Sequence, residues 1–347
     1  MTKIKQGLIN KVKEILPVGM RKKIRRVFPP AIYPPQNIVI EVTNRCNLHC
    51  RMCPQHSKET GVGIHRKEGL MEMNLYKRII DEVKEYGEVM VSPIGAGEPL
   101  IHPEIIEMVH YAKEAGCKTH IITNGTLLTP KISERLINAG LDIIAISIDG
   151  IRKQTHEGIR LGSNFERVVS NIEALLRLKK DSQANIKVRI MTVELEENKG
   201  EISDIIDKWF PLVDEVLISA HRVESGRHLL HEKIYPLVQR VPCNRLWQMM
   251  VISWNGLVAL CCDDWAEEVI LGDVHNTSLR KIWFSKEFQK IRQYHLKGEY
   301  DKVSICNNCD SWLEANTCVR IEGNRKIIEN PVVCCYTHIP TNLTKDS

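Results

Sequence analysis

Residues 43–54 read TNRCNLHCRMCP and hold three cysteines, Cys46, Cys50 and Cys53, separated by three and then two residues. Three thiolates can bind three irons of a four-iron cluster and leave the fourth iron without a protein ligand. An open iron of this kind can bind a small molecule and do chemistry on it. Cysteine clusters also bind zinc or form disulfides, so the spacing alone leaves those two alternatives open.

The composition is that of an ordinary globular protein. A length of 347 residues suggests about two domains, and 43% hydrophobic and 26% charged residues are typical values. No apolar run is long enough to span a membrane, and the N-terminus lacks the apolar region of a secretory signal. We therefore expect a cytoplasmic protein, in which twelve cysteines indicate metal or cluster binding and not disulfides.

The positive charge is concentrated at the N-terminus. Up to Phe28 there are nine basic residues and one acidic residue, a charge of +8, so the chain's net +5 leaves −3 for the rest. A net charge of −3 on the residues after Phe28 does not suggest nucleic-acid binding. Residues 3–16 have the apolar spacing of a short amphipathic helix, which could contact an anionic membrane surface or pack on the body as a leader. Pro29-Pro30 and Pro34-Pro35 then indicate a linker.

From residue 37 onward, short apolar strands alternate with helical patterns, as in parallel β/α units. The predicted strands are residues 37–42, 88–93, 118–123, 141–147, 186–193 and 214–219. The predicted helices are residues 73–86, 103–116, 130–139, 164–180 and 200–209. Six such units predict a partial barrel, smaller than the eight-stranded (β/α)8 barrel.

Polar motifs follow the predicted strands at their carboxyl ends. The cysteine loop follows the first strand, Gly95-Ala96-Gly97-Glu98-Pro99 the second, Thr123-Asn124-Gly125 the third, and Ser147-Ile148-Asp149-Gly150 the fourth. In barrel enzymes the active site lies at the carboxyl ends of the strands. The motifs are therefore expected to form one shared site, although each could alone be a turn or a helix cap.

The cysteine loop and these motifs resemble the radical S-adenosylmethionine (SAM) enzymes. The resemblance implies that SAM chelates the open iron of a [4Fe–4S] cluster held by Cys46, Cys50 and Cys53. Gly97-Glu98-Pro99 resembles the family's Gly-Gly-Glu-Pro, with Ala96 replacing the first glycine. The implied SAM contacts are Met52, Gly97, Glu98, Pro99, Asn124, Ser147, Asp149 and Arg160. The reaction implied is reductive cleavage of SAM to a 5′-deoxyadenosyl radical, which removes hydrogen from the substrate.

A second set of cysteines lies downstream: Cys243, Cys261, Cys306 and Cys309. Between the first two, residues 254–261 read as a β-hairpin with an Asn255-Gly256 turn, which would bring Cys243 and Cys261 together. A helix is predicted around residues 279–283. The pattern resembles the SPASM or shorter twitch domain of many radical SAM enzymes, which implies one auxiliary [4Fe–4S] cluster. A zinc site held by the same thiolates is the alternative.

Five cysteines stay unassigned. Cys262, Cys318, Cys334 and Cys335 could contribute to a second auxiliary cluster or include a thiol that donates hydrogen to a substrate radical, and Cys117 is expected to be a buried small hydrophobe. His221 and Arg222 follow the sixth strand, where a proton acceptor would serve alcohol oxidation.

The sequence predicts four segments along the chain. We expect a basic leader and Pro-rich linker (1–35), a radical SAM partial (β/α)6 barrel (36–225), a small α+β auxiliary-cluster domain (240–320) and a C-terminal tail (321–347). The fold class is therefore α/β with a TIM-like partial barrel.

The leading functional hypothesis is oxidation of a small polar substrate such as a sugar or aminocyclitol alcohol, as the resemblance to butirosin-pathway aminocyclitol dehydrogenase suggests. The alternatives are radical modification of a peptide, by crosslinking, epimerisation or side-chain oxidation, and a metal-stabilised interaction protein. The first 36 residues are expected to be too short for a peptide-leader-binding domain. A reductant such as flavodoxin or ferredoxin is the expected partner.

Overall fold

Six parallel strands form the centre of the computed structural model, which describes residues 33–57, 66–224, 227–228, 240–315 and 317–339. They are β1 (Asn37–Ile40), β2 (Met90–Ser92), β3 (Lys118–Thr123), β4 (Ile143–Ser147), β5 (Lys187–Glu194) and β6 (Glu215–Ala220). Each pairs in parallel with the next along the chain. The six predicted strands and the α/β partial barrel are thereby confirmed.

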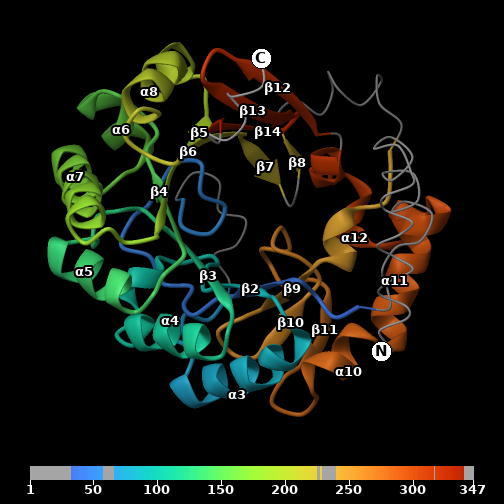
Figure 1. The fold of residues 1–347 in the computed structure, drawn as a ribbon. Helices are drawn as coiled ribbons and strands as arrows, with labels where there is room; N and C mark the ends of the chain where they lie inside the picture. The colour runs from blue at the N-terminus through green and yellow to red at the C-terminus, as the bar shows by residue number, and fades with distance from the viewer. Residues whose placement is uncertain (1–32, 58–65, 225–226, 229–239, 316, 340–347) are drawn as a thin grey trace, which may run out of the picture. The chain divides into compact units, whose positions relative to one another are not determined.

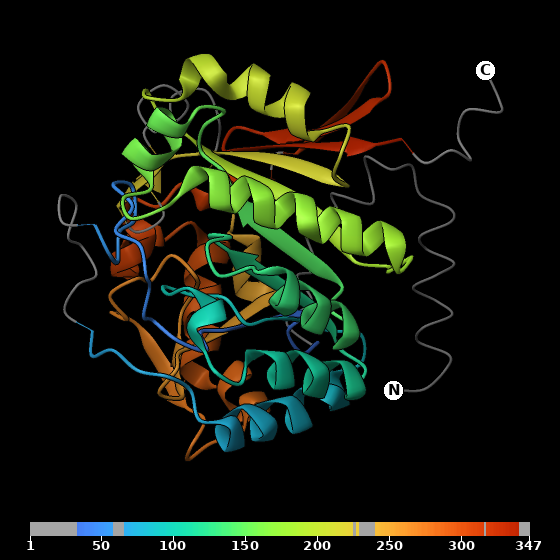
Figure 2. The same cartoon turned by 90° about the vertical axis from the view of Figure 1, so that its left-hand side faces the viewer.

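Helices follow the strands and cover the outer face of the curved sheet (Figure 1). They are α3 (Met73–Val83), α4 (Ile105–Glu114), α5 (Pro130–Asn138), α6 (Lys153–Ile159), α7 (Phe165–Asp181) and α8 (Ile202–Trp209), with short 3-10 turns η1 (Lys84–Tyr86), η2 (Pro99–Ile101) and η3 (Lys199–Glu201). Thr129 caps α5 and Asn164 caps α7, each accepting a backbone N–H of the first turn. Helix α6 was not predicted from the sequence. Figure 2 shows α7 running beside the strands on their outer side.

The two faces of the sheet differ in polarity. Along β5, Val188 and Ile190 are fully buried, as expected for side chains that face the helices. Successive strand residues point to opposite faces, so Arg189 and Met191 face the inside of the barrel. Arg189 pairs there with Glu215 of the neighbouring β6, its directly opposite residue in the register. The interior of the barrel is therefore partly polar.

Strands from the C-terminal part extend the sheet at both edges, as Figure 1 shows. At one edge, β9 (Met249–Ile252) pairs in parallel with β1 and is followed by antiparallel β10 (Leu257–Ala259) and β11 (Ile270–Asp273). At the other, β14 (Val333–His338) pairs antiparallel with β6 and continues into β13 (Arg325–Asn330) and β12 (Cys318–Glu322). A separate two-stranded ribbon joins β7 (Arg222–Glu224) and β8 (Arg227–His228).

The predicted hairpin is present between β9 and β10. Gly256 adopts φ +85° at its turn, a left-handed conformation that glycine adopts without a steric penalty. The predicted helix also forms, as α10 (Leu279–Trp283). It is followed by α11 (Lys286–Lys297) and α12 (Ser304–Asn307), with η5 (Asn244–Trp247), η6 (Tyr300–Lys302) and η7 (Ser311–Ala315) nearby.

Residues 321–347, for which the sequence predicted only a tail, contain β13 and β14. Strand β14 pairs with β6, more than a hundred residues earlier, which no local pattern indicates, and β13 pairs with β14. Backbone contacts divide the chain into two units, Met1–Pro34 and Pro35–Ser347. The predicted amphipathic helix at 3–16 lies outside the described residues. Within the described ranges, no helix has the length and apolarity to cross a membrane.

Candidate functional site

The cysteine loop leaves the end of β1 and is fixed by hydrogen bonds within the loop and to segments distant in the sequence. Thr43 donates its hydroxyl to the carbonyl of Gly69 at 2.8 Å. The backbone of Arg51 donates to the carbonyl of Ile159 at 2.9 Å, which ties the loop to the end of α6. Cys53 closes a turn on the carbonyl of Cys50 at 3.0 Å. The loop is therefore anchored on both sides of its cysteines.

The three thiols of this loop lie close enough to influence one another. Burial raises the pKa of Cys46 to about 12, and negative charge on Cys50 or Cys53 raises it further. Burial likewise raises the pKa of Cys50, while the guanidinium of Arg160 opposes that rise. Arg160 Nη1 lies 3.9 Å from Cys50 Sγ. A buried cation beside three converging thiols suits a cluster of thiolates, since it offsets their negative charge.

Glu98, at the end of the loop after β2, is only 2% exposed and its carboxylate is fully engaged. Its oxygens accept the Thr123 hydroxyl and the Asn124 backbone N–H at 2.7 Å each, and the Leu100 N–H at 3.1 Å. The side chain therefore joins the ends of β2 and β3. Its role as a SAM contact stays a prediction, and in the structure the carboxylate holds the two loops together.

Gly97 and Pro99 flank this glutamate. A Cβ at Gly97 would lie 2.4 Å from the carbonyl oxygen of Arg45 and 2.5 Å from that of Thr43, so only glycine permits this approach to the cysteine loop. The Glu98 N–H donates to the Arg45 carbonyl at 2.8 Å. Pro99 is buried at the start of η2. The motif after β2 is thus packed directly against the cysteine loop.

Asn124 connects β3 to the same loop. Its amide donates to Asn47 Oδ1 at 2.9 Å, and Asn47 in turn donates to the Thr126 hydroxyl at 2.9 Å. Asn124 Oδ1 accepts the Thr126 hydroxyl at 2.6 Å. The structure places Asn124 beside the cysteine loop, and its role as a SAM contact stays a prediction.

Asp149 and Arg160 form a buried ion pair after β4. Arg160 Nε lies 2.6 Å from Asp149 Oδ2, with side-chain exposures of 10% and 0%. Asp149 Oδ1 also accepts the Val193 N–H at 2.8 Å. Burial raises the pKa of Asp149, and the guanidinium opposes that rise. The pair links the ends of β4 and β5 to the Cys50 thiol.

His156 supports this ion pair through the backbone of Asp149. The Asp149 N–H donates to His156 Nδ1 at 3.3 Å, so the imidazole proton lies on Nε2, which faces the Ser163 hydroxyl at 3.1 Å. Burial lowers the pKa of His156 to about 3, with Arg160 adding to the effect. The ring is therefore neutral and fixes the turn that carries Asp149. No motif or spacing in the sequence indicates a role for His156.

The remaining predicted contacts lie around the same mouth. Ser147 is buried at the end of β4, on the barrel-facing side with Met191 opposite. Met52 is half-buried, and its backbone carbonyl accepts a hydrogen bond from the His221 ring, whose pKa burial lowers. His221 therefore does reach the cysteine loop. Arg222 begins β7, and its side chain is outside the described part of the structure.

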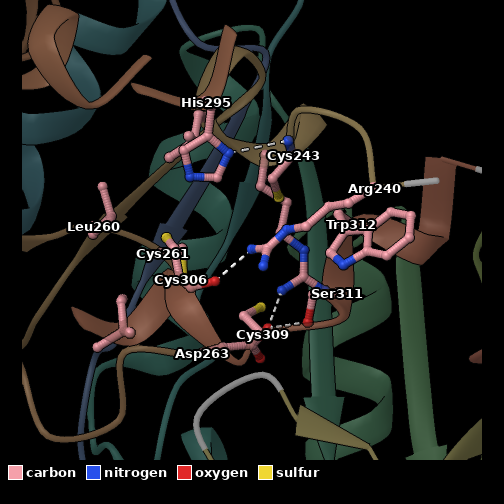
Figure 3. Close-up of a pocket in the computed structure, with 13 residues that line it drawn as sticks. Arg240, Cys243, Leu260, Cys261, Asp263, His295, Cys306, Cys309, Ser311 and Trp312 are labelled. Atoms are coloured by element: carbon pink, nitrogen blue, oxygen red, sulfur yellow. Dashed lines mark hydrogen bonds and ion pairs between the residues drawn. The ribbon is translucent and has the colours of Figure 1, made fainter. Parts of the chain in front are cut away.

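The second set of cysteines surrounds a single pocket. Cys243, Cys261, Cys306 and Cys309 all line one pocket, and Figure 3 shows it with His295 and Trp312 among the surrounding residues. Burial is the main cause that raises the pKa of Cys243 to about 12 and also raises that of Cys306, and charge on Cys309 adds to both. In the described ranges, no three Cys, His, Asp or Glu side chains are placed to hold a single metal ion.

Two arginines contribute positive charge to the pocket. Arg245 is buried and forms ion pairs with Asp263 and Glu314, the latter at 2.5 Å. Arg240 donates to the backbone carbonyls of Cys306 and Asn307. Asp263 and Glu314 offset the charge of Arg245, so the fit to a four-iron cluster depends on the four cysteines themselves.

The other candidate cysteines lie elsewhere. Cys262 accepts a hydrogen bond from Arg245 at 3.2 Å, beside the pocket. Cys318 on β12 and Cys334 on β14 both face Glu329, at 3.6 and 3.9 Å. Cys335 points to the opposite face of β14, toward the barrel interior with its register partner Leu217. Cys117 is 1% exposed, as predicted for a buried hydrophobe.

A buried polar network connects the cysteine loop to the C-terminal part. Arg66 forms ion pairs with Glu41 at the end of β1 and with Glu267, and Ser253 donates to Glu267. Glu41 also accepts the Ala96 N–H at 3.1 Å. The sequence offered no spacing that would reveal this network, since Glu41, Arg66 and Glu267 lie in three separate segments of the chain.

Two family models match the chain. The radical SAM superfamily model matches residues 40–208, and an iron–sulfur cluster-binding domain model, SPASM, matches residues 243–310. The first covers β1 to α8 with the Cys46 loop, and the second covers the pocket of four cysteines. The predicted resemblance is thereby confirmed, with the [4Fe–4S] cluster, SAM and auxiliary iron–sulfur binding that these domains imply.

Characterised proteins show the same likeness. AdoMet-dependent heme synthase of Methanosarcina barkeri is 34% identical over 65% of this chain and 62% of its own length, less than two thirds of that relative. A tungsten-containing aldehyde ferredoxin oxidoreductase cofactor-modifying protein of Pyrococcus furiosus is 23% identical over 85% of this chain and 97% of its own. The structure of BtrN in complex with AdoMet and 2-DOIA superposes with a TM-score of 0.53 at 20% identity, covering 80% of this chain and 93% of BtrN. At that identity the last match concerns the fold.

Proposed function

The chain belongs to the radical SAM superfamily and carries a SPASM iron–sulfur domain, and from this premise we propose that it oxidises a small polar substrate, such as a sugar or aminocyclitol alcohol. When bound and reduced, the first cluster supplies the electron that cleaves SAM so that a hydrogen atom can be taken from the substrate. Cys46, Cys50 and Cys53 would hold that cluster.

The protein's own residues hold the SAM-binding loops in place. The assigned SAM contacts remain Met52, Gly97, Glu98, Pro99, Asn124, Ser147, Asp149 and Arg160. Because protein donors already bind the Glu98 carboxylate, its contribution is to fix the loop backbone after β2 and β3. Arg160 offers the cation for a carboxylate, and its partner Asp149 orients it.

The observation that carries the oxidation proposal is the single pocket lined by Cys243, Cys261, Cys306 and Cys309. A four-iron cluster held by four thiolates has no iron left to bind a substrate, so it is suited to electron transfer. Converting CH–OH to C=O removes a hydrogen atom, an electron and a proton. The SAM-derived group would take the hydrogen atom, the cluster that these four cysteines would hold would accept the electron, and the proton would go to a base.

The barrel interior supports a polar substrate. Arg189 and Glu215 form their ion pair there, and His120 of β3 shares this face through the register with Ile143 and Ala145. Polar groups in a binding space fix the orientation of a hydroxylated ligand. His221 is the candidate base: burial lowers its pKa, so its ring is neutral at pH 7 and able to accept a proton.

The test separates SAM cleavage from substrate oxidation. The anaerobically reconstituted protein and its Cys243→Ala and Cys306→Ala variants are incubated with SAM, a flavodoxin or ferredoxin reducing system and a panel of aminocyclitols and sugars. We expect 5′-deoxyadenosine from all three proteins and an oxidised product from the wild type alone. Cys117→Ala, buried outside both sites, is the matched control. Oxidised product from both auxiliary variants would contradict the proposed electron transfer.

Peptide modification is the second candidate, because β12 is an exposed edge strand. Val319 and Ile321 are 59% and 66% exposed on one face of it. An extended peptide can add to such an edge by backbone hydrogen bonds. A peptide panel in the same assay distinguishes the two classes. No 5′-deoxyadenosine from any protein would favour the third reading, a metal-stabilised interaction protein.

A further inference from the structure

His295 lies in the last turn of α11 and lines the pocket of the four cysteines. It is 2% exposed and packs edge-on against Tyr300, with ring centroids 5.1 Å apart. Its imidazole is thereby held in one orientation. Figure 3 shows the ring on the same side of the pocket as Cys243, above the sulfur atoms of Cys261 and Cys306.

The hydrogen bond at one ring nitrogen determines where the proton of the other lies. The backbone N–H of Cys243 donates to His295 Nδ1 at 3.4 Å. Nδ1 is therefore an acceptor, and the neutral ring carries its proton on Nε2. Nε2 is buried and has no hydrogen-bond partner among the residues that the structure describes.

Arg245, Arg240 and Ser311 also line the pocket, and each directs donors to protein acceptors. Arg245 binds Asp263 and Glu314, Arg240 binds backbone carbonyls of α12, and the Ser311 hydroxyl donates to Asp263 at 2.6 Å. A buried N–H without an acceptor is unfavourable and rare, so each such group requires an explanation. The group that fills the pocket is the missing acceptor.

We propose that His295 donates its Nε2 hydrogen to a sulfur atom of the auxiliary cluster and so raises the cluster's reduction potential. The inference rests on the proposed function for the assignment of the four cysteines as ligands. Reduction adds negative charge that is shared by the cluster sulfurs, and a hydrogen bond to a more negative acceptor is stronger. The histidine therefore stabilises the reduced cluster more than the oxidised one, which favours its role as electron acceptor.

The test measures the auxiliary cluster alone. In a background with Cys46, Cys50 and Cys53 replaced by alanine, potentiometric titration followed by electron paramagnetic resonance gives its midpoint potential. We expect His295→Leu to lower the equilibrium constant for reduction about tenfold, a potential lower by about 59 mV for one electron. His295→Gln retains an N–H donor and should recover most of that loss. His102→Leu, a buried histidine of the barrel bonded to Met71, should leave the potential unchanged.

Each outcome decides the proposal. An unchanged potential and unchanged spectrum in His295→Leu at full iron content would overturn it while leaving the ligand assignment intact. Loss of the cluster from both His295→Leu and His295→Gln would show that the ring only packs the pocket, and would also overturn it. A background protein that binds no cluster would overturn the assignment of the four cysteines, and this inference with it.

Discussion

Replacing Asp149 by asparagine tests whether the buried ion pair stabilises the mouth of the barrel. The substitution keeps the shape of the side chain and an oxygen for the Val193 N–H, and it removes the charge opposite Arg160. Arg160 would then be a buried cation beside the Cys50 thiol, without its carboxylate. Breaking a buried pair in this way typically costs about 3–5 kcal/mol of unfolding free energy.

Urea unfolding of the cluster-free protein at pH 7, followed by circular dichroism, measures this cost. For a slope of about 3 kcal/mol per molar urea, the midpoint should fall by about 1 to 1.7 M. The matched control is Glu166→Gln, which makes the same chemical change in an exposed pair, Lys153–Glu166 at 2.9 Å with exposures of 53% and 61%. Solvent screens that pair, so its midpoint should match the wild type.

A second substitution distinguishes an uncompensated charge from a packing defect. In the double variant Asp149→Asn with Arg160→Met, no buried cation is left, so stability should recover in part relative to the single variant. If Asp149→Asn shifts the midpoint no more than Glu166→Gln does, the buried pair contributes nothing measurable and the reasoning is wrong. A double variant less stable than the single one would also refute it.

Three further predictions concern other parts of the chain. Gly158 lies inside α6 with open space around it, so Gly158→Ala should stabilise the fold by about 0.5–1 kcal/mol in urea unfolding. Gly256 has φ +85°, so Gly256→Ala should destabilise the fold by at least about 1 kcal/mol in the same assay. Glu98→Gln should cost about 1.5–3 kcal/mol because an amide cannot accept all the hydrogen bonds of the carboxylate, and should reduce SAM affinity in equilibrium dialysis. The full chain should co-sediment with phosphatidylserine vesicles more than a chain starting at Ala31, because residues 3–16 combine basic and apolar side chains.

Each of these three predictions has a result that would contradict it. A stabilising Gly256→Ala would mean that the hairpin turn tolerates a side chain. Unchanged stability of Glu98→Gln would show that its hydrogen bonds do not join β2 to β3. Equal sedimentation of the two chains would dismiss the membrane contact.

The β/α alternation made the barrel predictable, because each strand and each helix carries its own local pattern. The six strand positions agree to within about two or three residues with β1 to β6. What the sequence could not give is pairing across long separations: β9 beside β1 and β14 beside β6 are set by backbone hydrogen bonds between segments that no periodicity connects. Helix α6 was missed because it is short, and Gly158 in its last turn weakens the helical pattern.

The candidate site, like the fold, was predictable only where the signal lies within a short stretch of sequence. Cysteine spacing indicated both sets of thiols, since ligands of one cluster recur at short intervals or flank a hairpin. The partners of Glu98 and the tautomer of His295 depend on atoms from distant segments, so residue identity alone could not reveal them. The resemblance implied Glu98 as a SAM contact, which stays a prediction, and the structure adds the hydrogen bonds that its carboxylate accepts from Thr123 and Asn124.

The most direct test of the central claim is 5′-deoxyadenosine formation by the reconstituted protein with SAM and a low-potential reductant. Wild type and Cys243→Ala should both form 5′-deoxyadenosine, because the first cluster is held by Cys46, Cys50 and Cys53. Cys50→Ala should form none above the reaction without protein. Equal amounts from Cys50→Ala and wild type, or none from wild type at full iron and sulfide content, would contradict a radical SAM site in this loop.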